Sequence, residues 1–412
     1  MSGAGNPTGG WRLPRHELAL LAAIVLVYVG TGWLDPNHTY FGNWAESRDI
    51  ILRNTSLLGI IALGAAVVII AGGIDLSAGS MVAFSATTCA LLLTVFSEVD
   101  DRRLVTVGPL GIALAVGGAL LSGLLVGTLH AWLITAIRLP PFVATLATLV
   151  GLRSFARAMC LFVTRQRWGS ESQQINVNTP FFAWLKEHNV WISTAAFLAI
   201  ALLTWLILTR TVLGRHLYAL GGNEQAARLS GVRTDNVKWF AYCFGSLTAA
   251  LAGIFLMADS SVAQPGTLAR GYELNAIAAA VVGGCSLQGG VGTVPGTVLG
   301  ALFLRLVIDA VSKLIKASAD IYEGMIVGII VALAVTLTQV GQSAKAGRVL
   351  FPGARGLAAI PTIATFAGLL AMMAAANLDA VKGRTAAFGL AVGVAVLLLL
   401  AAVRWMEGRR SS

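Results

Sequence analysis

The amino-acid sequence predicts an all-α polytopic membrane protein with about twelve transmembrane helices, because uncharged apolar runs recur along the chain and a bilayer core takes about 20 such residues per helix. Of its 412 residues, 57% are hydrophobic and 12% are charged, whereas a soluble globular chain carries about 25% charged residues. So few charges leave too little polar surface to face water, and the mean hydropathy of +0.79 agrees. The membrane is therefore the expected environment of most of this chain.

The first predicted helix covers residues 18–30, after a polar segment, 1–17, that we expect to be cytoplasmic. No small-residue cleavage site follows the run, so it predicts an uncleaved span rather than a signal peptide. Further uncharged runs predict helices at 55–71, 76–97, 104–129, 190–209, 239–258, 324–344, 356–378 and 385–403. Two less regular stretches complete the set. Residues 141–164 contain two arginines, and 272–311 are interrupted by glycines and long enough for two crossings.

Two of the connecting segments are long enough to have structure of their own. Alternation from a cytoplasmic N-terminus places 161–189 outside and the basic segment 210–238 inside, the side on which Lys and Arg are enriched. The net charge of +10 is spread over such short segments, without a basic patch interleaved with aromatic residues. This pattern indicates membrane lipid as the partner of the basic residues and argues against nucleic acid.

The sequence lacks the common patterns of an enzyme. It has no G-x-x-x-x-G-K-[ST] phosphate loop, no H-E-x-x-H and no G-x-S-x-G. The five histidines are scattered, and the four cysteines lie singly in apolar runs, which is typical of packing residues. We therefore expect no catalytic residue, no metal and no cofactor, and a transport or channel function.

The inside segment carries a predicted short helix within residues 222–231. Asn223 is a good N-cap, and Glu224 follows in the first turn, where a carboxylate favours the positive end of the helix dipole. Glu224 and Arg228 are spaced i, i+4 in the favourable order, and Gly231 is placed to end the helix. A capped polar helix on the inner face is either a docking element or an interfacial helix that rests on lipid headgroups.

Four stretches together resemble the permeases of ABC sugar importers of the ribose, xylose and galactoside type, within the branched-chain amino-acid/sugar permease superfamily. They are LGRHLYALGGNEQAARLSG (213–231), GGIDLSAGS (72–80), RLPPFVATLATL (138–149) and SSVAQPGTLARGYELNAIAAAVVGG (260–284). Their order and spacing resemble that family over residues 18–342. The resemblance implies a transmembrane permease domain, 18–343, with about ten helices and a cytoplasmic coupling loop at 210–238.

The same resemblance implies a function and its partners. Such a permease carries a monosaccharide across the cytoplasmic (inner) membrane, usually as a homodimer, and has no ATPase site of its own. A cytoplasmic ATP-binding subunit drives it, and a periplasmic or lipid-anchored sugar-binding protein delivers the sugar. Ala227 is expected to be the small residue that lets the ATP-binding subunit approach. The full set expected to couple the permease to that subunit is Gly222, Asn223, Glu224, Ala227, Arg228 and Gly231.

This chain departs from the family pattern in two places. Residues 344–412 form an extension with two predicted helices beyond the usual end, and Asn275 stands where an Asp is usual. We therefore expect the permease core to be complete before the extension, and we assign no carboxylate role to position 275.

Polar residues at helix breaks are the candidates for the translocation path. Asp75 and Ser77 lie at a predicted break, where their oxygens either cap the next helix or face the path. Gln264, Glu273 and Asn275 lie near the outer mouth or inside the glycine-broken segment. Polar side chains on unwound backbone there suit a hydroxyl-rich solute better than an ion.

Two further patterns concern helix faces. Arg153 and Arg157 share one face, and we expect them to snorkel to the outer interface; contact with sugar hydroxyls or with the binding protein is the alternative. Gly292, Gly296 and Gly300 form a G-x-x-x-G-x-x-x-G helix-packing face. Such a face lets backbones approach closely, either within a subunit or between subunits.

Other transporters and a membrane enzyme are the alternatives to a sugar permease. Among ABC permeases, importers of nucleosides or of branched-chain amino acids are the nearest. An ion-coupled secondary transporter would need buried acidic residues that face a cavity, and the candidates for that role are Asp75, Asp309 and Glu273.

Overall fold

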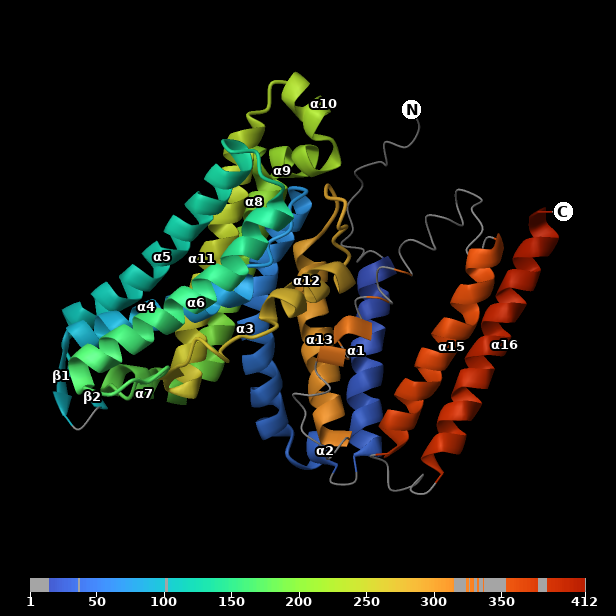
Figure 1. Cartoon of the computed structure of the whole chain (residues 1–412), viewed down its shortest axis with the longest axis horizontal. Helices are drawn as coiled ribbons and strands as arrows, with labels where there is room; N and C mark the ends of the chain where they lie inside the picture. Colours follow the sequence, from blue (N-terminus) through green and yellow to red (C-terminus); the bar gives the residue numbers. More distant parts are fainter. Residues whose placement is uncertain are drawn as a thin grey trace. The chain divides into compact units, whose positions relative to one another are not determined.

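The computed structural model describes a chain that is almost entirely helical. The described residues are 15–35, 38–100, 103–314, 353–376 and 384–411, with a few isolated residues between 324 and 336. Within them, ten helices are long and apolar enough to cross a membrane (Figure 1), which confirms the predicted all-α membrane fold. The chain divides into two compact units, Met1–Val307 and Ile308–Ser412.

Long helices alternate with short connecting elements. The long helices before the C-terminal extension are α1 (Arg15–Leu34), α3 (Trp44–Ile70), α4 (Ala78–Val95), α5 (Pro109–Thr135), α6 (Pro141–Trp168), α8 (Asn189–Arg210), α11 (Thr234–Ser260) and α13 (Val294–Leu314). The short helices are α2 (Thr39–Gly42), α7 (Pro180–Glu187), α9 (Val212–Gly222), α10 (Glu224–Leu229) and α12 (Tyr272–Val282). Proline begins α5, α6 and α7, because its missing N–H and fixed φ suit the first helical position.

Two small antiparallel ribbons lie among the connections. They are β1 (Ser97–Asp100) with β2 (Arg103–Val107), and β3 (Ile175–Asn176) with β4 (Val262–Ala263). In the second ribbon Ile175 pairs with Ala263. This ribbon joins the segment before α7 to the chain that leaves α11.

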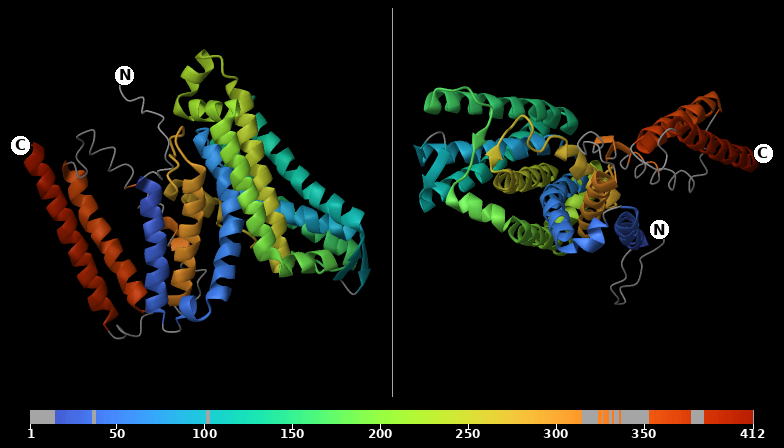
Figure 2. Two further views of the ribbon diagram at one scale, coloured as in Figure 1. Left: turned by 180° about the vertical axis from the view of Figure 1, so that it is seen from behind. Right: turned by 90° about the horizontal axis from the view of Figure 1, so that it is seen from below.

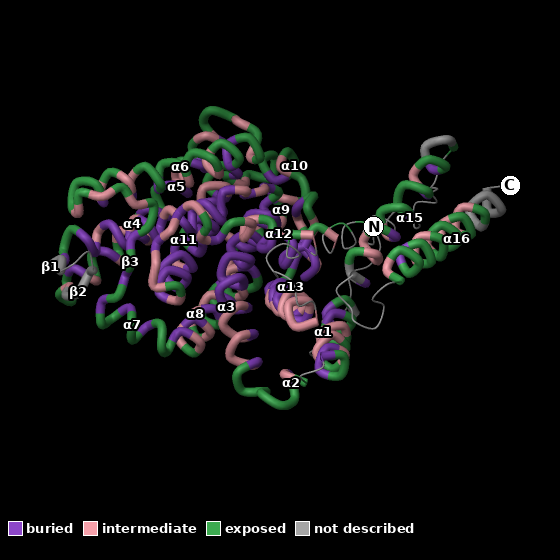
Figure 3. The backbone as a smooth tube through the Cα atoms, turned by 60° about the horizontal axis from the view of Figure 1, so that its bottom comes forward, coloured by how far each residue is buried: buried purple, intermediate pink, exposed green. Residues whose placement is uncertain are grey.

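Helices α3, α4 and α11 form the buried centre of the first unit (Figure 3). The buried share of the apolar stretch is 89% in α3, 78% in α4 and 72% in α11, against 11% in α6. Glycines let these backbones approach, since a Cβ on Gly64 would lie 3.0 Å from the Cα of Gly245, and one on Gly253 would meet the carbonyl oxygen of Val82. Close packing of small residues holds helices together where lipid supplies no hydrophobic driving force.

Several helix boundaries differ from the sequence-based prediction. Helix α3 begins at Trp44 rather than at residue 55, because its first turns carry charged residues that a hydropathy criterion rejects. The stretch 272–311 contains one full-length helix, α13, rather than two. Helix α12 has 11 residues, and at about 16 Å it is too short for a hydrocarbon core of about 30 Å. The predicted helix at 324–344 falls mostly outside the described residues.

The second unit contains two long helices, α15 (Gly353–Ala376) and α16 (Thr385–Ser411), which lie side by side in all views (Figures 1 and 2). At their contact, a Cβ on Gly368 would lie 2.8 Å from the carbonyl oxygen of Gly389 and 3.2 Å from the Cα of Gly393. The two predicted C-terminal helices therefore form one hairpin with a glycine-mediated contact.

Candidate functional site

Helix α10 lies at one end of the helical bundle, beside α9 and the turn between α12 and α13 (Figures 1 and 2). Asn223 Oδ1 accepts a hydrogen bond from the N–H of Ala226 at 3.0 Å. Gly231 follows the helix with a φ of +83°, a conformation that favours glycine at this position. The predicted N-cap and the predicted terminating glycine are therefore both present at this end of the bundle, the α10 end.

Ionic contacts fasten α10 to the first turns of α11. Glu224 accepts from Lys238 Nζ at 2.6 Å and from Arg228 Nη2 at 3.4 Å, so the predicted i, i+4 pair exists. Arg228 also donates to the hydroxyl of Thr234 at 3.1 Å. A six-residue helix is not stable in isolation. These contacts therefore hold α10 in a defined orientation.

Two side chains of α10 are placed differently from the expectation. Ala227 is 5% exposed and packs against its own chain, so its side chain offers little surface to a partner. Leu229 is 90% exposed, and sequence reasoning missed it. The one available signal was a large apolar residue at the end of an otherwise polar helix.

Helix α9 supports α10. The sequence did not indicate it as a helix distinct from the inside loop. Thr211 Oγ1 caps it by accepting from the N–H of Gly214 at 3.1 Å. Leu217 and Leu220 are buried and fix one face of α9 on the bundle. A single residue, Asn223, separates α9 from α10, so the two helices are closely linked.

A cavity of 670 Å³ lies beside α10. Its walls come from residues 71–73 after α3, from 138–141 between α5 and α6, and from 221–224 between α9 and α10. Lys238 and Tyr242 of α11 are among the other residues that line it. The cavity therefore joins the predicted coupling helix to the predicted helix break between α3 and α4.

Asp75 fixes this helix break and is 5% exposed. Its Oδ1 accepts from the N–H of Ser77 at 2.8 Å and from the Ser77 hydroxyl at 2.6 Å. The carbonyl of Ser77 accepts from the hydroxyl of Ser80 at 2.7 Å. Asp75 and Ser77 thus order the backbone that leads into α4, in the manner of an Asx turn. His130 of α5 is fully buried and forms a hydrogen bond with the hydroxyl of Thr148 on α6 at 2.7 Å.

An unwound segment, 264–271, separates β4 from α12. Arg153, midway along α6, donates from Nη1 to the carbonyl oxygens of Pro265 at 2.9 Å and Leu268 at 3.0 Å. Non-helical backbone at membrane depth needs such partners, so Arg153 stabilises this segment instead of snorkelling as expected. Arg157 donates to the exposed side chain of Gln173.

Glu273 lies in the first turn of α12 and reaches the start of α4. A Cβ on Gly79 would touch its Oε2, and this oxygen is buried without a hydrogen-bond partner in the described part of the chain. Asn275 follows on α12 and is 4% exposed. The structure therefore brings Glu273 to the helix break that Asp75 orders, and it places Gln264, half-buried, where the unwound segment begins.

Two of the three predicted glycines, Gly296 and Gly300, lie on α13 and contact the end of α12 of the same chain, whereas Gly292 precedes α13 and is not part of a helix face. A Cβ on Gly296 would meet the carbonyl oxygen of Gly283, and one on Gly300 would lie 2.8 Å from the Gly283 nitrogen. A Cβ on Gly292 would lie 2.6 Å from the sulfur of Cys285. The close approach that the G-x-x-x-G pattern favours is thus used within the chain.

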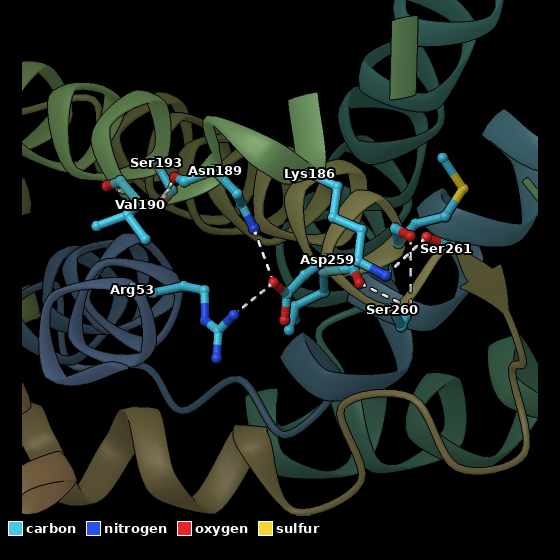
Figure 4. Close-up of polar contacts among 10 residues, drawn as sticks. Arg53, Lys186, Asn189, Val190, Ser193, Asp259, Ser260 and Ser261 are labelled. Atoms are coloured by element: carbon cyan, nitrogen blue, oxygen red, sulfur yellow. Dashed lines mark hydrogen bonds and ion pairs between the residues drawn. The ribbon is translucent and has the colours of Figure 1, made fainter. Parts of the chain in front are cut away.

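A polar cluster links α3, α7 and α8 to the end of α11 (Figure 4). Asp259 at the end of α11 accepts from Arg53 of α3 at 3.1 Å and from Asn189 of α8 at 3.2 Å. Lys186 of α7 donates to the hydroxyl of Ser261 at 3.1 Å. Across the residues that the structure describes, no three His, Cys, Asp or Glu side chains gather to hold a metal ion, and this cluster serves to fasten helices.

Comparison with known proteins gives one consistent result. Residues 47–335 match the model of a family described as branched-chain amino acid transport system / permease component. The ribose import permease protein RbsC of Escherichia coli (strain K12) is 34% identical over 349 residues, which cover 81% of this chain and 96% of the relative. RbsC of Haemophilus influenzae is 32% identical over 337 residues, with the same coverage of 81% and 96%.

The name of a third relative gives a different solute. The autoinducer 2 import system permease protein LsrC of Yersinia pestis (strain Pestoides F) is 34% identical over 316 residues, which cover 76% of this chain and 82% of the relative. No solved structure matches the chain at a significant level.

Proposed function

Since this chain belongs to the branched-chain amino acid transport system permease family, we propose that it carries a monosaccharide inward across the cytoplasmic membrane. It is a permease of an ABC importer, a multi-pass membrane protein without a catalytic ATPase domain. Support for a monosaccharide comes from the two ribose import permeases, each matched over 96% of its length.

The proposed docking site for the ATP-binding subunit is α10, with the α10 end of the bundle facing the cytoplasm. The exposure of Leu229, at 90%, is the observation that carries this assignment. Protein interfaces commonly combine an apolar centre with a polar rim, and Leu229 beside the charged side chains of α10 offers that arrangement. Glu224 and its ionic contacts hold the anchor in place, so the partner meets a preorganised surface.

The proposed translocation path lies where α4 and α12 begin. Asp75 and Ser77 order the backbone that enters α4, Glu273 of α12 touches Gly79 near the start of α4, Asn275 follows on α12, and the unwound segment 264–271 leads into α12. Broken helices that meet at mid-depth are a common device of transporters. In this proposal two copies of the chain enclose the path, and a sugar-binding protein delivers the solute at the end opposite to α10.

Autoinducer 2 is the second candidate solute, because LsrC is as similar to this chain as the ribose permease is, at 34% identity. The two candidates share the importer class and differ in the solute alone.

Uptake by proteoliposomes distinguishes the candidates. The chain is reconstituted with its cognate ATP-binding subunit and binding protein, and labelled ribose, xylose, galactose, autoinducer 2, a nucleoside and leucine are supplied in turn. We expect saturable, ATP-dependent uptake of a monosaccharide. Uptake of autoinducer 2, the nucleoside or leucine without any monosaccharide would overturn the proposed solute and leave the permease class intact.

A further inference from the structure

We infer that a junction of four glycines relays movement of the docking helix α10 to both sides of the translocation path. The junction consists of Gly72, Gly221, Gly289 and Gly290. This inference rests on the proposed docking of the ATP-binding subunit at α10, and it adds the physical route by which docking reaches α12 and the α3–α4 break.

Three segments of backbone are in direct contact at the junction. A Cβ on Gly289 would lie 2.7 Å from the carbonyl oxygen of Gly221 and 2.8 Å from the Cα of Gly72. A Cβ on Gly290 would lie 2.8 Å from the Cα of Gly222. Real Cβ atoms essentially never approach other atoms so closely, so a side chain at these positions would force the segments apart.

Backbone conformation and hydrogen bonding support the same contact. Gly72, Gly289 and Gly290 have φ values of +82°, +85° and +71°, which residues with a Cβ adopt at a cost. The N–H of Gly290 donates to the carbonyl of Ile70, at the end of α3, at 2.9 Å. The turn between α12 and α13 is thus hydrogen-bonded to α3 at the point where α9 presses against both.

A side-chain bond ties α9 to the same turn. Tyr218 of α9 donates its hydroxyl to the carbonyl oxygen of Gly292 at 2.8 Å. Burial raises the pKa of Tyr218, so the hydroxyl stays protonated and continues to donate at neutral pH. Helix α9 is therefore joined to the turn by a hydrogen bond as well as by packing.

Helix α1 holds the turn from another side. His16 Nε2 forms a hydrogen bond with the carbonyl of Val282 at 2.9 Å. The hydroxyl of Thr293 donates to Glu17 Oε1 at 2.8 Å, and Glu17 is 4% exposed. Close-packed elements that are held on several sides shift as units between discrete arrangements rather than deform. A displacement of α9 therefore displaces the turn.

Both sides of the proposed path begin at this junction. The turn directly follows α12, whose first turn carries Glu273, and Gly72 lies three residues before Asp75 in the segment that leads to α4. The contact between Glu273 and Gly79 thus joins two elements that are both attached to the junction. Movement of α10 reaches that contact through α9 and the glycines.

A variant of Gly221 tests the relay in the assembled complex with the ATP-binding subunit. A Cβ there would collide with the carbonyl oxygen of Ile70 and lie 2.5 Å from the Gly290 nitrogen, whereas one on Gly117 of α5 meets nothing within 4 Å. Gly221→Ala is therefore compared with Gly117→Ala as the matched control. The reporter is Cys285, 3% exposed in the turn, as the remaining thiol after alanine replaces the other cysteines.

The measurement is the rate of maleimide labelling of Cys285 with and without ATP and vanadate. We expect the trapped state to change this rate in the parent and in Gly117→Ala. In Gly221→Ala we expect the change to shrink about tenfold, which lies in the range of allosteric couplings, while copurification and ATP hydrolysis stay at parental levels. An equal change in both variants would overturn the relay, and so would an unchanged rate in the parent.

A more conservative variant tests the relay if the Gly221→Ala protein does not accumulate in the membrane. Tyr218→Phe removes one hydroxyl from the junction, and Tyr28→Phe removes the matched bond to the carbonyl of Tyr40 at 3.2 Å. We expect Tyr218→Phe to reduce the response of Cys285 about fivefold, the effect of one hydrogen bond, and Tyr28→Phe to leave it unchanged. Equal responses would contradict the relay.

Copurification separates the relay from the docking on which it rests. Loss of the ATP-binding subunit from Gly221→Ala or Tyr218→Phe would overturn the relay, because the junction would then shape the docking surface itself. A parent chain that fails to copurify with the ATP-binding subunit would instead overturn the proposed docking at α10, and the relay with it.

Discussion

Arg153 forms hydrogen bonds with the backbone rather than reaching the outer membrane interface. Its guanidinium satisfies two carbonyl oxygens of the unwound segment. In Arg153→Met both carbonyls lose their partner, at about 1–3 kcal/mol each, so we expect the detergent-solubilised protein to unfold at a clearly lower temperature by circular dichroism. Arg157→Met is the control, since Arg157 makes an exposed contact and exposed contacts contribute little. Equal unfolding midpoints for the two variants would contradict the assigned role.

Variants of Leu229 and Ala227 distinguish an effect on docking from an effect on the local folding of α10. Leu229→Ser removes an exposed apolar anchor and leaves the cap and the Glu224 contacts intact. We expect copurification with the ATP-binding subunit to fall about tenfold or more, as for a typical hot spot, while α10 stays resistant to protease. Ala227→Trp overfills a buried site, at about 1–3 kcal/mol, and is expected to lose both copurification and protease resistance. Parental copurification of Leu229→Ser would remove the basis for docking at α10.

Single residues were predictable where their partners are near in sequence. The cap at Asn223 and the pair of Glu224 with Arg228 depend on spacings of three and four residues, which the sequence displays directly. The carbonyl partners of Arg153 lie 112 and 115 residues away, and no local pattern reports them. The burial of Ala227 depends likewise on the packing of α9 and α11.

The contact between α12 and α13 depends on Gly296. A leucine there would collide with the carbonyl of Gly283 and separate the two helices, at about 1–3 kcal/mol. We expect Gly296→Leu to insert, because α13 keeps its apolar length, but to lose thermal stability and transport. Gly30→Leu in α1 is the control, since a Cβ there meets nothing within 4 Å. Identical stability and uptake in both variants would mean that this face of α13 meets lipid.

Hydropathy predicted where the long helices lie along the chain but not how long each one is. The half-length α12 ends because Gly284 adopts a φ of +97° and the chain reverses there, whereas a hydropathy sum over 272–311 counts enough apolar residues for two helices. Helix α9 escaped prediction because glycine, arginine and histidine interrupt its apolar face. Its buried leucines become informative once the bundle beneath them is known.

The C-terminal hairpin lies outside the part of the chain that matches the family. The family match ends at residue 335, and α15 and α16 pack on each other through Gly368 and Gly389. A chain that stops after Ala344 is therefore expected to reach the membrane, to copurify with the ATP-binding subunit and to keep part of the transport. Membrane yield and copurification check this expectation. Absence of the shortened chain from the membrane fraction would show that the permease needs the extension in order to fold.

The all-helical membrane fold was predictable because the bilayer restricts the choice of structure. Backbone groups in lipid must pair within helices, so long uncharged runs could be assigned directly. The order of packing was not predictable, because α3, α4 and α11 reach the centre through small residues such as Gly64 and Gly253, and hydropathy does not distinguish a lipid-facing apolar helix from a buried one.

ATP-dependent uptake by proteoliposomes that contain the parent chain or Glu224→Arg tests the central claim most directly. Glu224 lies 2.6 Å from Lys238 and 3.4 Å from Arg228, so a positive charge at 224 would detach α10 from α11 and remove the docking surface. We predict that the parent accumulates the monosaccharide when ATP is supplied on the side of the ATP-binding subunit, and that Glu224→Arg inserts but accumulates none. Accumulation driven by a proton or sodium gradient without ATP, and equal in both chains, would contradict the account.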